Sequence, residues 1–136
     1  MKKLMIMIIA LMLSSCTTLQ YGNFTPNQQS KDSYLAKDAV SQINCLYPAA
    51  RNTFCLRQRV RDAFGIALIE GLRKKGYGIK ENVCTRNKAN FFYVVDETKP
   101  NKVYRVSLYI GSQTLTRAYS VNGKTPIPIT PWSFKE

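Results

Sequence analysis

Two stretches of the chain place apolar residues at the spacing of an amphipathic helix. The first covers residues 34–46, where Ser33 is in position to cap the start. The second covers residues 60–75, with basic residues in its last turn and Gly76 where a left-handed cap residue is expected. We therefore expect two helices, each with one buried face. The apolar residues of these faces are Leu35, Ala39, Ile43 and Leu46 in the first helix, and Val60, Phe64, Ala67, Leu68 and Leu72 in the second.

The second half of the chain carries the patterns of β-strands. Residues 91–95 form a continuous aromatic and β-branched run, which is typical of a central strand. Residues 103–110 and 113–121 flank Gly111-Ser112, a pair that fits a two-residue type II′ hairpin turn and fixes the register. Further short strands are expected at 51–58 and 77–80, and a turn at 96–102. The expected cross-strand pairs are Ile110 with Gln113, Leu108 with Leu115, Val106 with Arg117, and Tyr104 with Tyr119.

The two ends of the chain show neither period. Residues 16–33 are polar and contain Gly and Pro, which predicts a flexible tether. Residues 123–136 contain three prolines, which predicts an extended tail. Between them, residues 34–122 are expected to form an α+β domain, with two helices packed on one face of a small, mostly antiparallel three- to four-stranded sheet. Four aromatic residues of the end segments are candidate contacts with a partner: Tyr21, Phe24, Trp132 and Phe134. The last two could instead fold back on the domain.

Charge and residue types limit the chemistry that is expected. The 136-residue chain has a formal net charge of +12, which favours an anionic partner such as a nucleic acid, an anionic lipid or an acidic protein face. The basic residues are scattered without interleaved aromatics, so a groove for single-stranded nucleic acid is not expected. The chain has no histidine, the commonest general base, and the adjacent carboxylates Asp96 and Glu97 start an expected turn. Neither an enzyme nor a metal site is therefore predicted.

The N-terminus has the features of an export signal. Lys2 and Lys3 precede an apolar run over residues 4–13, which is shorter than the roughly 20 residues that span a bilayer. Leu13-Ser14-Ser15-Cys16 follows and resembles the bacterial lipobox. We expect residues 1–15 to be a signal peptide and Cys16 to carry a diacylglycerol and acyl chains, with no other cofactor. An ordinary signal peptide that happens to contain a cysteine is the alternative.

Three further cysteines, Cys45, Cys55 and Cys84, would lie in an oxidising compartment if the chain is exported. Three thiols cannot all pair within one chain, so one disulfide and one free thiol is the simplest arrangement. The sequence does not distinguish the three possible pairs. A free thiol could bridge to another protein, and the three side chains could also be small buried hydrophobic groups.

Short motifs along the chain also form a recognisable series. They include Leu35-Ala36-Lys37-Asp38-Ala39-Val40, Leu46-Tyr47-Pro48-Ala49-Ala50-Arg51, Asp62-Ala63-Phe64-Gly65, Gly76-Tyr77, Tyr104-Arg105-Val106 and Gln113-Thr114-Leu115-Thr116-Arg117-Ala118-Tyr119. With the lipobox and Tyr21-Gly22-Asn23-Phe24, their order and spacing resemble TrbH-type conjugal transfer lipoproteins of P-type type IV secretion systems. The resemblance covers nearly all of the chain after Cys16. The cysteines at 45, 55 and 84 are not part of that pattern.

The resemblance implies a lipoprotein on the periplasmic face of the outer membrane. It would act as a structural or assembly component of a conjugative secretion channel. Its implied partners are the outer-membrane channel subunit, the envelope-spanning subunit and the lipoprotein maturation and sorting machinery. No direct contact with nucleic acid is implied. Two other classes remain open: a periplasmic regulatory or pilot lipoprotein for a cell-wall synthase or a secretin, and a wall-binding protein that uses its basic face.

Overall fold

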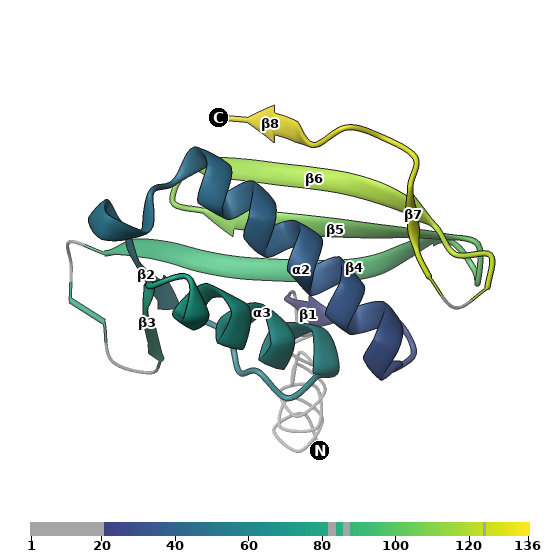
Figure 1. Ribbon diagram of the computed structural model, residues 1–136, viewed down its shortest axis with the longest axis horizontal. Helices are drawn as coiled ribbons and strands as arrows, with labels where there is room; N and C mark the ends of the chain where they lie inside the picture. The colour runs from purple at the N-terminus through teal and green to yellow at the C-terminus, as the bar shows by residue number, and fades with distance from the viewer. Residues whose placement is uncertain (1–20, 82–83, 86–87, 124) are drawn as a thin grey trace, which may run out of the picture.

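The computed structural model describes residues 21–81, 84–85, 88–123 and 125–136. The predicted signal peptide and the predicted acylation site Cys16 therefore lie outside the described residues. In the described part, two helices, α2 (Gln29–Leu46) and α3 (Ala63–Lys74), cover one face of a mixed sheet. Figure 1 shows the two helices side by side in front of the strands. A short 3₁₀ turn, η1 (Ala49–Arg51), follows α2.

The sheet has eight strands, so the expectation of three or four mostly antiparallel strands is an undercount. Strands run in the order β3-β2-β4-β5-β6-β7, while β1 pairs with β4 and β8 pairs with β6. The pairs β1–β4, β2–β3 and β2–β4 are parallel, and the remaining pairs are antiparallel. The strands are β1 (Gly22–Asn23), β2 (Thr53–Leu56), β3 (Gly78–Glu81), β4 (Ala89–Lys99), β5 (Val103–Ile110), β6 (Gln113–Ser120), β7 (Ile127–Pro128) and β8 (Ser133–Lys135).

The β5–β6 hairpin has the register that its turn predicts. All four expected pairs occur, from Ile110 opposite Gln113 to Tyr104 opposite Tyr119. Gly111 has φ +60°, the left-handed value that the first position of a type II′ turn requires. The turn expected at 96–102 is shorter than predicted, because β4 continues to Lys99 and Asn101 takes the positive φ. Asp96 and Glu97 consequently lie in a strand.

Both helices begin at residues other than those predicted. α2 starts at Gln29, ahead of Ser33, because the carboxylate of Asp32 accepts a hydrogen bond from the backbone N–H of Gln28 at 3.0 Å. α3 starts at Ala63, because Asp62 is its N-cap and accepts from the backbone N–H of Gly65 at 2.8 Å.

The hydrophobic core lies between the helices and the sheet. The predicted helix faces are largely confirmed, since Leu35, Ala39 and Ile43 of α2 are fully buried. Leu46 is the exception and is 42% exposed, because α2 ends there and the ring of Tyr47 packs against Phe54 instead. The buried apolar residues of α3 are Phe64, Leu68, Ile69 and Leu72, and those of the central strands are Phe91, Tyr93, Val95, Tyr104, Val106, Leu108, Ile110, Leu115 and Tyr119.

Candidate interaction site

The segment 21–33, predicted as a tether, is part of the fold in the structure. Its β1 strand pairs with β4, and the backbone N–H of Phe24 donates to the carbonyl of Val95 at 2.8 Å. The ring of Tyr21 stacks on Phe92 with centroids 4.2 Å apart and meets the edge of Tyr109 at 5.7 Å. Because Phe91 and Tyr93 point into the core, Phe92 lies on the sheet face opposite the helices. Tyr21 therefore covers part of that face, which no helix of the described residues covers and which we call the open sheet face.

A buried polar cluster fixes this N-terminal segment. Lys31 is 1% exposed, and its ammonium donates to Thr25 Oγ1 and to the carbonyl of Pro26, both at 2.8 Å. The Lys31 Nζ also lies 4.5 Å from the centre of the Tyr104 ring. Asp32 is fully buried and accepts from the side-chain amide of Asn23 at 3.2 Å. Polar residues that looked solvent-exposed in the sequence are thus interior residues.

The charges in this cluster compensate each other at close range. The Lys31 ammonium lies 3.6 Å from a carboxylate oxygen of Asp32. Burial lowers the pKa of Lys31, and the nearby carboxylates of Asp32 and Glu97 oppose that shift. Because every charged atom here has a partner, the role of the cluster is structural: it holds the N-terminal segment in place. Sequence reasoning missed it, since neither residue falls on a periodic apolar face.

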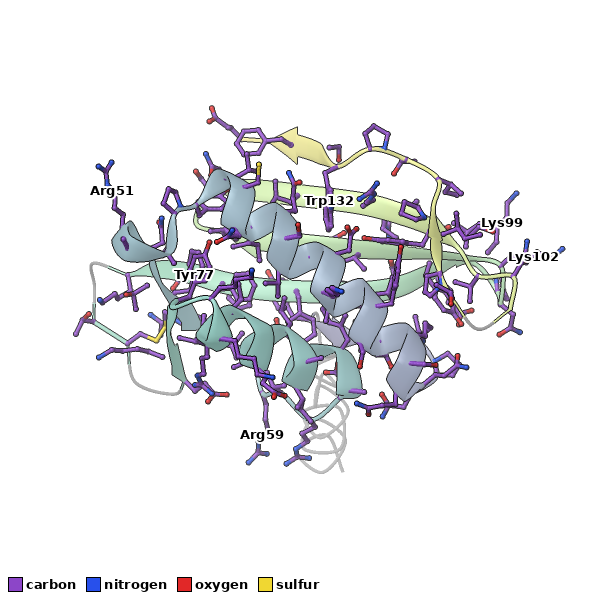
Figure 2. All side chains as sticks on the ribbon, viewed as in Figure 1. Arg51, Arg59, Tyr77, Lys99, Lys102 and Trp132 are labelled. Atoms are coloured by element: carbon purple, nitrogen blue, oxygen red, sulfur yellow. A yellow bond between two sulfur atoms is a disulfide. The ribbon has the colours of Figure 1, made fainter. Side chains whose placement is uncertain are left out.

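Beside β1 lies a shallow depression of about 420 Å³ with a basic and aromatic lining. The loop between β2 and α3 contributes Arg59 and Arg61, and the segment after β1 contributes Phe24. Phe24 is 54% exposed, as expected for a candidate contact residue. Figure 2 shows Arg59 pointing away from the body of the protein. We call the exposed side chains of Phe24, Arg59 and Arg61 the basic–aromatic face.

The Pro-rich tail, predicted to be extended, lies along the edge of β6 through β7 and β8. Trp132 is partly buried against the core and points toward the body of the fold (Figure 2). The guanidinium of Arg117 holds the tail through the carbonyl of Thr130 at 2.9 Å. Phe134, in contrast, is 50% exposed.

Arg117 of β6 is paired within the protein, because its guanidinium forms an ion pair with Asp38 of α2 at 2.9 Å. The hydroxyl of Tyr119 donates to the same Asp38 oxygen at 2.5 Å. Burial, followed by this hydrogen bond and the Asp38 charge, raises the pKa of Tyr119. The cluster thus joins α2, β6 and the tail.

Of the three cysteine pairs that the sequence left open, the structure contains Cys55–Cys84. This disulfide ties β2 to the segment that follows β3. Cys45 is the free cysteine among those described, and it is exposed on α2.

The described residues contain no helix that is long and apolar enough to cross a membrane. They also contain no group of three or more Cys, Asp or Glu side chains placed to hold a metal ion. The features left to consider are therefore surfaces: the basic–aromatic face, the open sheet face around Tyr21, and the tail with Phe134.

Comparison with models of protein families gives a match over most of the chain. The model of the family described as "Conjugal transfer protein TrbH" matches residues 18–136. The match includes the N-terminal segment, both helices, the whole sheet and the tail. No curated protein and no solved structure matches the chain.

Proposed function

The chain belongs to the TrbH family of conjugal transfer proteins, and from this premise we propose that it is an outer-membrane lipoprotein that helps to assemble a conjugative type IV secretion channel. The family match over residues 18–136 is the observation that carries the proposal, because it makes the chain a component of conjugal transfer. The membrane location and the assembly role are the finer parts of the proposal. Each has its own support and its own test.

The lipid anchor is supported by the order of residues at the N-terminus. The N-terminus has the order of features of a lipoprotein signal: two lysines, then a short apolar run, then Leu13-Ser14-Ser15-Cys16. Cleavage after Ser15 would leave Cys16 as the acylated first residue. Thr17 follows in place of Asp, the usual inner-membrane retention residue of enteric-type bacteria, which favours transfer to the outer membrane.

An assembly role is supported by how the polar groups are used. The buried acidic and basic groups pair with each other within the fold, as Lys31 does with Asp32. At the surface, several large apolar side chains are at least half exposed, and three of them belong to the tail, where a group of exposed apolar residues can mark a contact with another protein. The expected protein partners are the outer-membrane channel subunit and the envelope-spanning subunit. The exposed residues in question are Phe24, Ile66, Ile127, Ile129 and Phe134.

Acylation is tested with two matched cysteine variants in cells fed labelled palmitate. Cys16→Ser should lose the label and accumulate as the unprocessed precursor. Cys45→Ser is the control, because Cys45 is exposed, free and outside the lipobox, so labelling should persist. Retention of the label and of normal processing in Cys16→Ser would overturn the lipoprotein part of the proposal.

The assembly role is tested by mild detergent extraction of the tagged protein from donor cells, followed by mass spectrometry. Recovery of the outer-membrane channel subunit and the envelope-spanning subunit is the expected result. Recovery of a cell-wall synthase or a secretin in their place would replace the channel role by that of a regulatory or pilot lipoprotein.

A further inference from the structure

The distance between the proposed anchor and the fold is short. The first described residue is Tyr21, five residues after Cys16. Whatever the conformation between them, five residues span at most about 18 Å. A compact domain of about 120 residues is roughly 35 Å across, as its expected radius of gyration of about 14 Å implies. Only the half of the surface that is centred on Tyr21 can therefore touch a membrane that holds Cys16.

The surface near Tyr21 is the basic–aromatic face. Tyr21, Phe24, Arg59 and Arg61 line the same depression beside β1. Among the described residues, neither Arg59 nor Arg61 takes part in any of the salt bridges. Both side chains are exposed. Their charges are thus available to an external anion, whereas Asp62, the acidic residue beside them, already bonds to Gly65 and Tyr93.

The chemistry of this face matches that of an anionic phospholipid surface. Arginine pairs with phosphate oxygens through two parallel N–H groups. An exposed aromatic ring at the same level can enter the boundary between head groups and acyl chains. Phe24 is held there by its own backbone bond to Val95, so the ring projects from a fixed point of the sheet.

We propose that Phe24, Arg59 and Arg61 rest on the phosphate head groups of the anionic membrane that holds the acylated Cys16, and so fix the orientation of the domain. The inference rests on the proposed function, because it requires the acylated cysteine. The acyl chains attach the protein to the membrane, and the basic–aromatic face determines how the domain is oriented on it. The tail lies along β6, away from β4 and β1 in the strand order, so it points away from the membrane (Figure 1).

The test uses the full lipidated protein, reconstituted in vesicles that contain phosphatidylglycerol. A photoreactive benzoylphenylalanine replaces Phe24 in one sample and Phe134 in the other. The two positions are matched, since the native rings are 54% and 50% exposed. Illumination should give lipid adducts at position 24 in several-fold excess over position 134.

A charge test on the position-24 sample examines the arginines. Arg59→Gln with Arg61→Gln should lower the adduct yield roughly tenfold or more, since each basic residue near an anionic surface contributes strongly to its attraction. The control is the double variant Lys99→Gln with Lys102→Gln, which removes the same charge at the β4–β5 turn. Figure 2 shows this turn far from Arg59, so the adduct yield should be unchanged. Phosphatidylcholine vesicles, or high salt, should reproduce the arginine effect.

Intact mass measured before illumination separates the two proposals. If Cys16 carries no lipid, the lipoprotein proposal fails and this inference fails with it. If Cys16 is acylated but positions 24 and 134 give equal adducts, the inference alone is overturned. An adduct yield at position 24 that is insensitive to both charge pairs would also overturn it.

Discussion

The N-terminal segment and the C-terminal tail look alike in the sequence and are held in opposite ways. Both are polar or Pro-rich and lack periodicity, and both pair with the sheet. The N-terminal segment is fixed by a buried cluster in which Lys31 and Asp32 are almost fully inaccessible. The tail is fixed by edge-strand bonds, by the Arg117 guanidinium on the carbonyl of Thr130 and by one partly buried ring, Trp132. Its other large side chains are exposed, with Ile127 at 58% and Ile129 at 53%.

This difference predicts different modes of failure. A buried polar cluster is stable only when complete, because the loss of one partner leaves the other buried and unpaired. An edge strand with exposed side chains buries little area and can detach while the rest of the fold persists. The N-terminal segment should therefore unfold with the domain, and the tail should open alone. The four experiments that follow test this contrast, from the largest expected effect to the smallest.

Asp32→Ala should have the largest effect. It removes the partner of the Lys31 ammonium and the acceptor for the N–H of Gln28. Breaking a buried ion pair in this way costs about 3–5 kcal/mol of the free energy of unfolding. The control is Asp96→Ala, which breaks the more exposed pair with Arg105 and should cost less than about 1 kcal/mol. Chemical denaturation measures the free energy of unfolding of both variants. Equal losses would contradict a stabilising role for the buried Lys31–Asp32 pair.

Trp132→Ala should have an intermediate effect with a local character. Replacing a fully buried Trp costs about 3–5 kcal/mol, so this half-buried ring should cost about 2 kcal/mol. Amide exchange should speed up in β8 and leave α2 protected. Ile129→Ala, at an exposed tail position, is the control and should change stability by less than about 0.5 kcal/mol. Faster exchange across α2 as well would show that the tail and the domain unfold together.

These two regions also show where sequence reasoning reaches its limit. The β5–β6 register was predictable to the residue, because Gly111-Ser112 is a local signal and the strands it joins are adjacent. β1 and β7 have two residues each, too few to show a period of two. The parallel pairing of β2 with β3 and β4 depends on segments separated by a helix or a long connection. Local patterns cannot specify such pairs.

The candidate contact residues show the same limit. Tyr21 and Trp132 were identified as aromatic residues in polar surroundings, but the sequence could not show that they pack on their own domain. No pattern in the sequence indicated that Lys31 is buried, because its burial depends on Thr25 and on the ring of Tyr104, which lies 73 positions away in the chain. Whether Phe24 and Phe134 contact partners stays a prediction.

The buried polar clusters beside the two regions, one around Lys31 and one in which Tyr119 of β6 bonds to Asp38, should respond to alkali with opposite signs. The pKa of Tyr119 is raised above its ordinary value of 10.0 by burial and by Asp38, so its contribution is full below pH 10 and falls as the pH rises further. The pKa of Lys31 is lowered from 10.5 by burial, so the unfolded chain binds the extra proton and stability rises with pH up to about 10.5.

The measurement is the free energy of unfolding between pH 8 and pH 11 (a range set by the ordinary Tyr and Lys values). Each titrating group changes the slope by at most about 1.4 kcal/mol per pH unit. Tyr119→Phe should make the decline above pH 10 shallower without abolishing it, because burial also raises the pKa of Tyr93. Lys31→Met should remove the rise below pH 10.5. An unchanged slope in either variant would contradict the corresponding assignment.

Phe134→Ala should have the smallest effect on stability, but it tests the contrast between the N-terminal segment and the tail most directly. The ring is half exposed on an edge strand, so the free energy of unfolding should change by less than about 0.5 kcal/mol. Exposed aromatic side chains often carry much of the energy of a protein interface. Recovery of the channel subunits in the detergent extraction should therefore fall in Phe134→Ala, although the protein remains fully folded.

Phe24→Ala is the matched variant at the other end, because its ring is equally exposed but is proposed to face lipid. Recovery of the channel subunits should be unaffected by that change. If Phe24→Ala lowers recovery and Phe134→Ala does not, the orientation is reversed, and the tightly locked N-terminal segment, not the detachable tail, is the region that meets the channel. The two variants thus decide which end of the domain contacts the channel subunits: the rigid N-terminal segment fixed by buried charges, or the edge strand of the tail that can open.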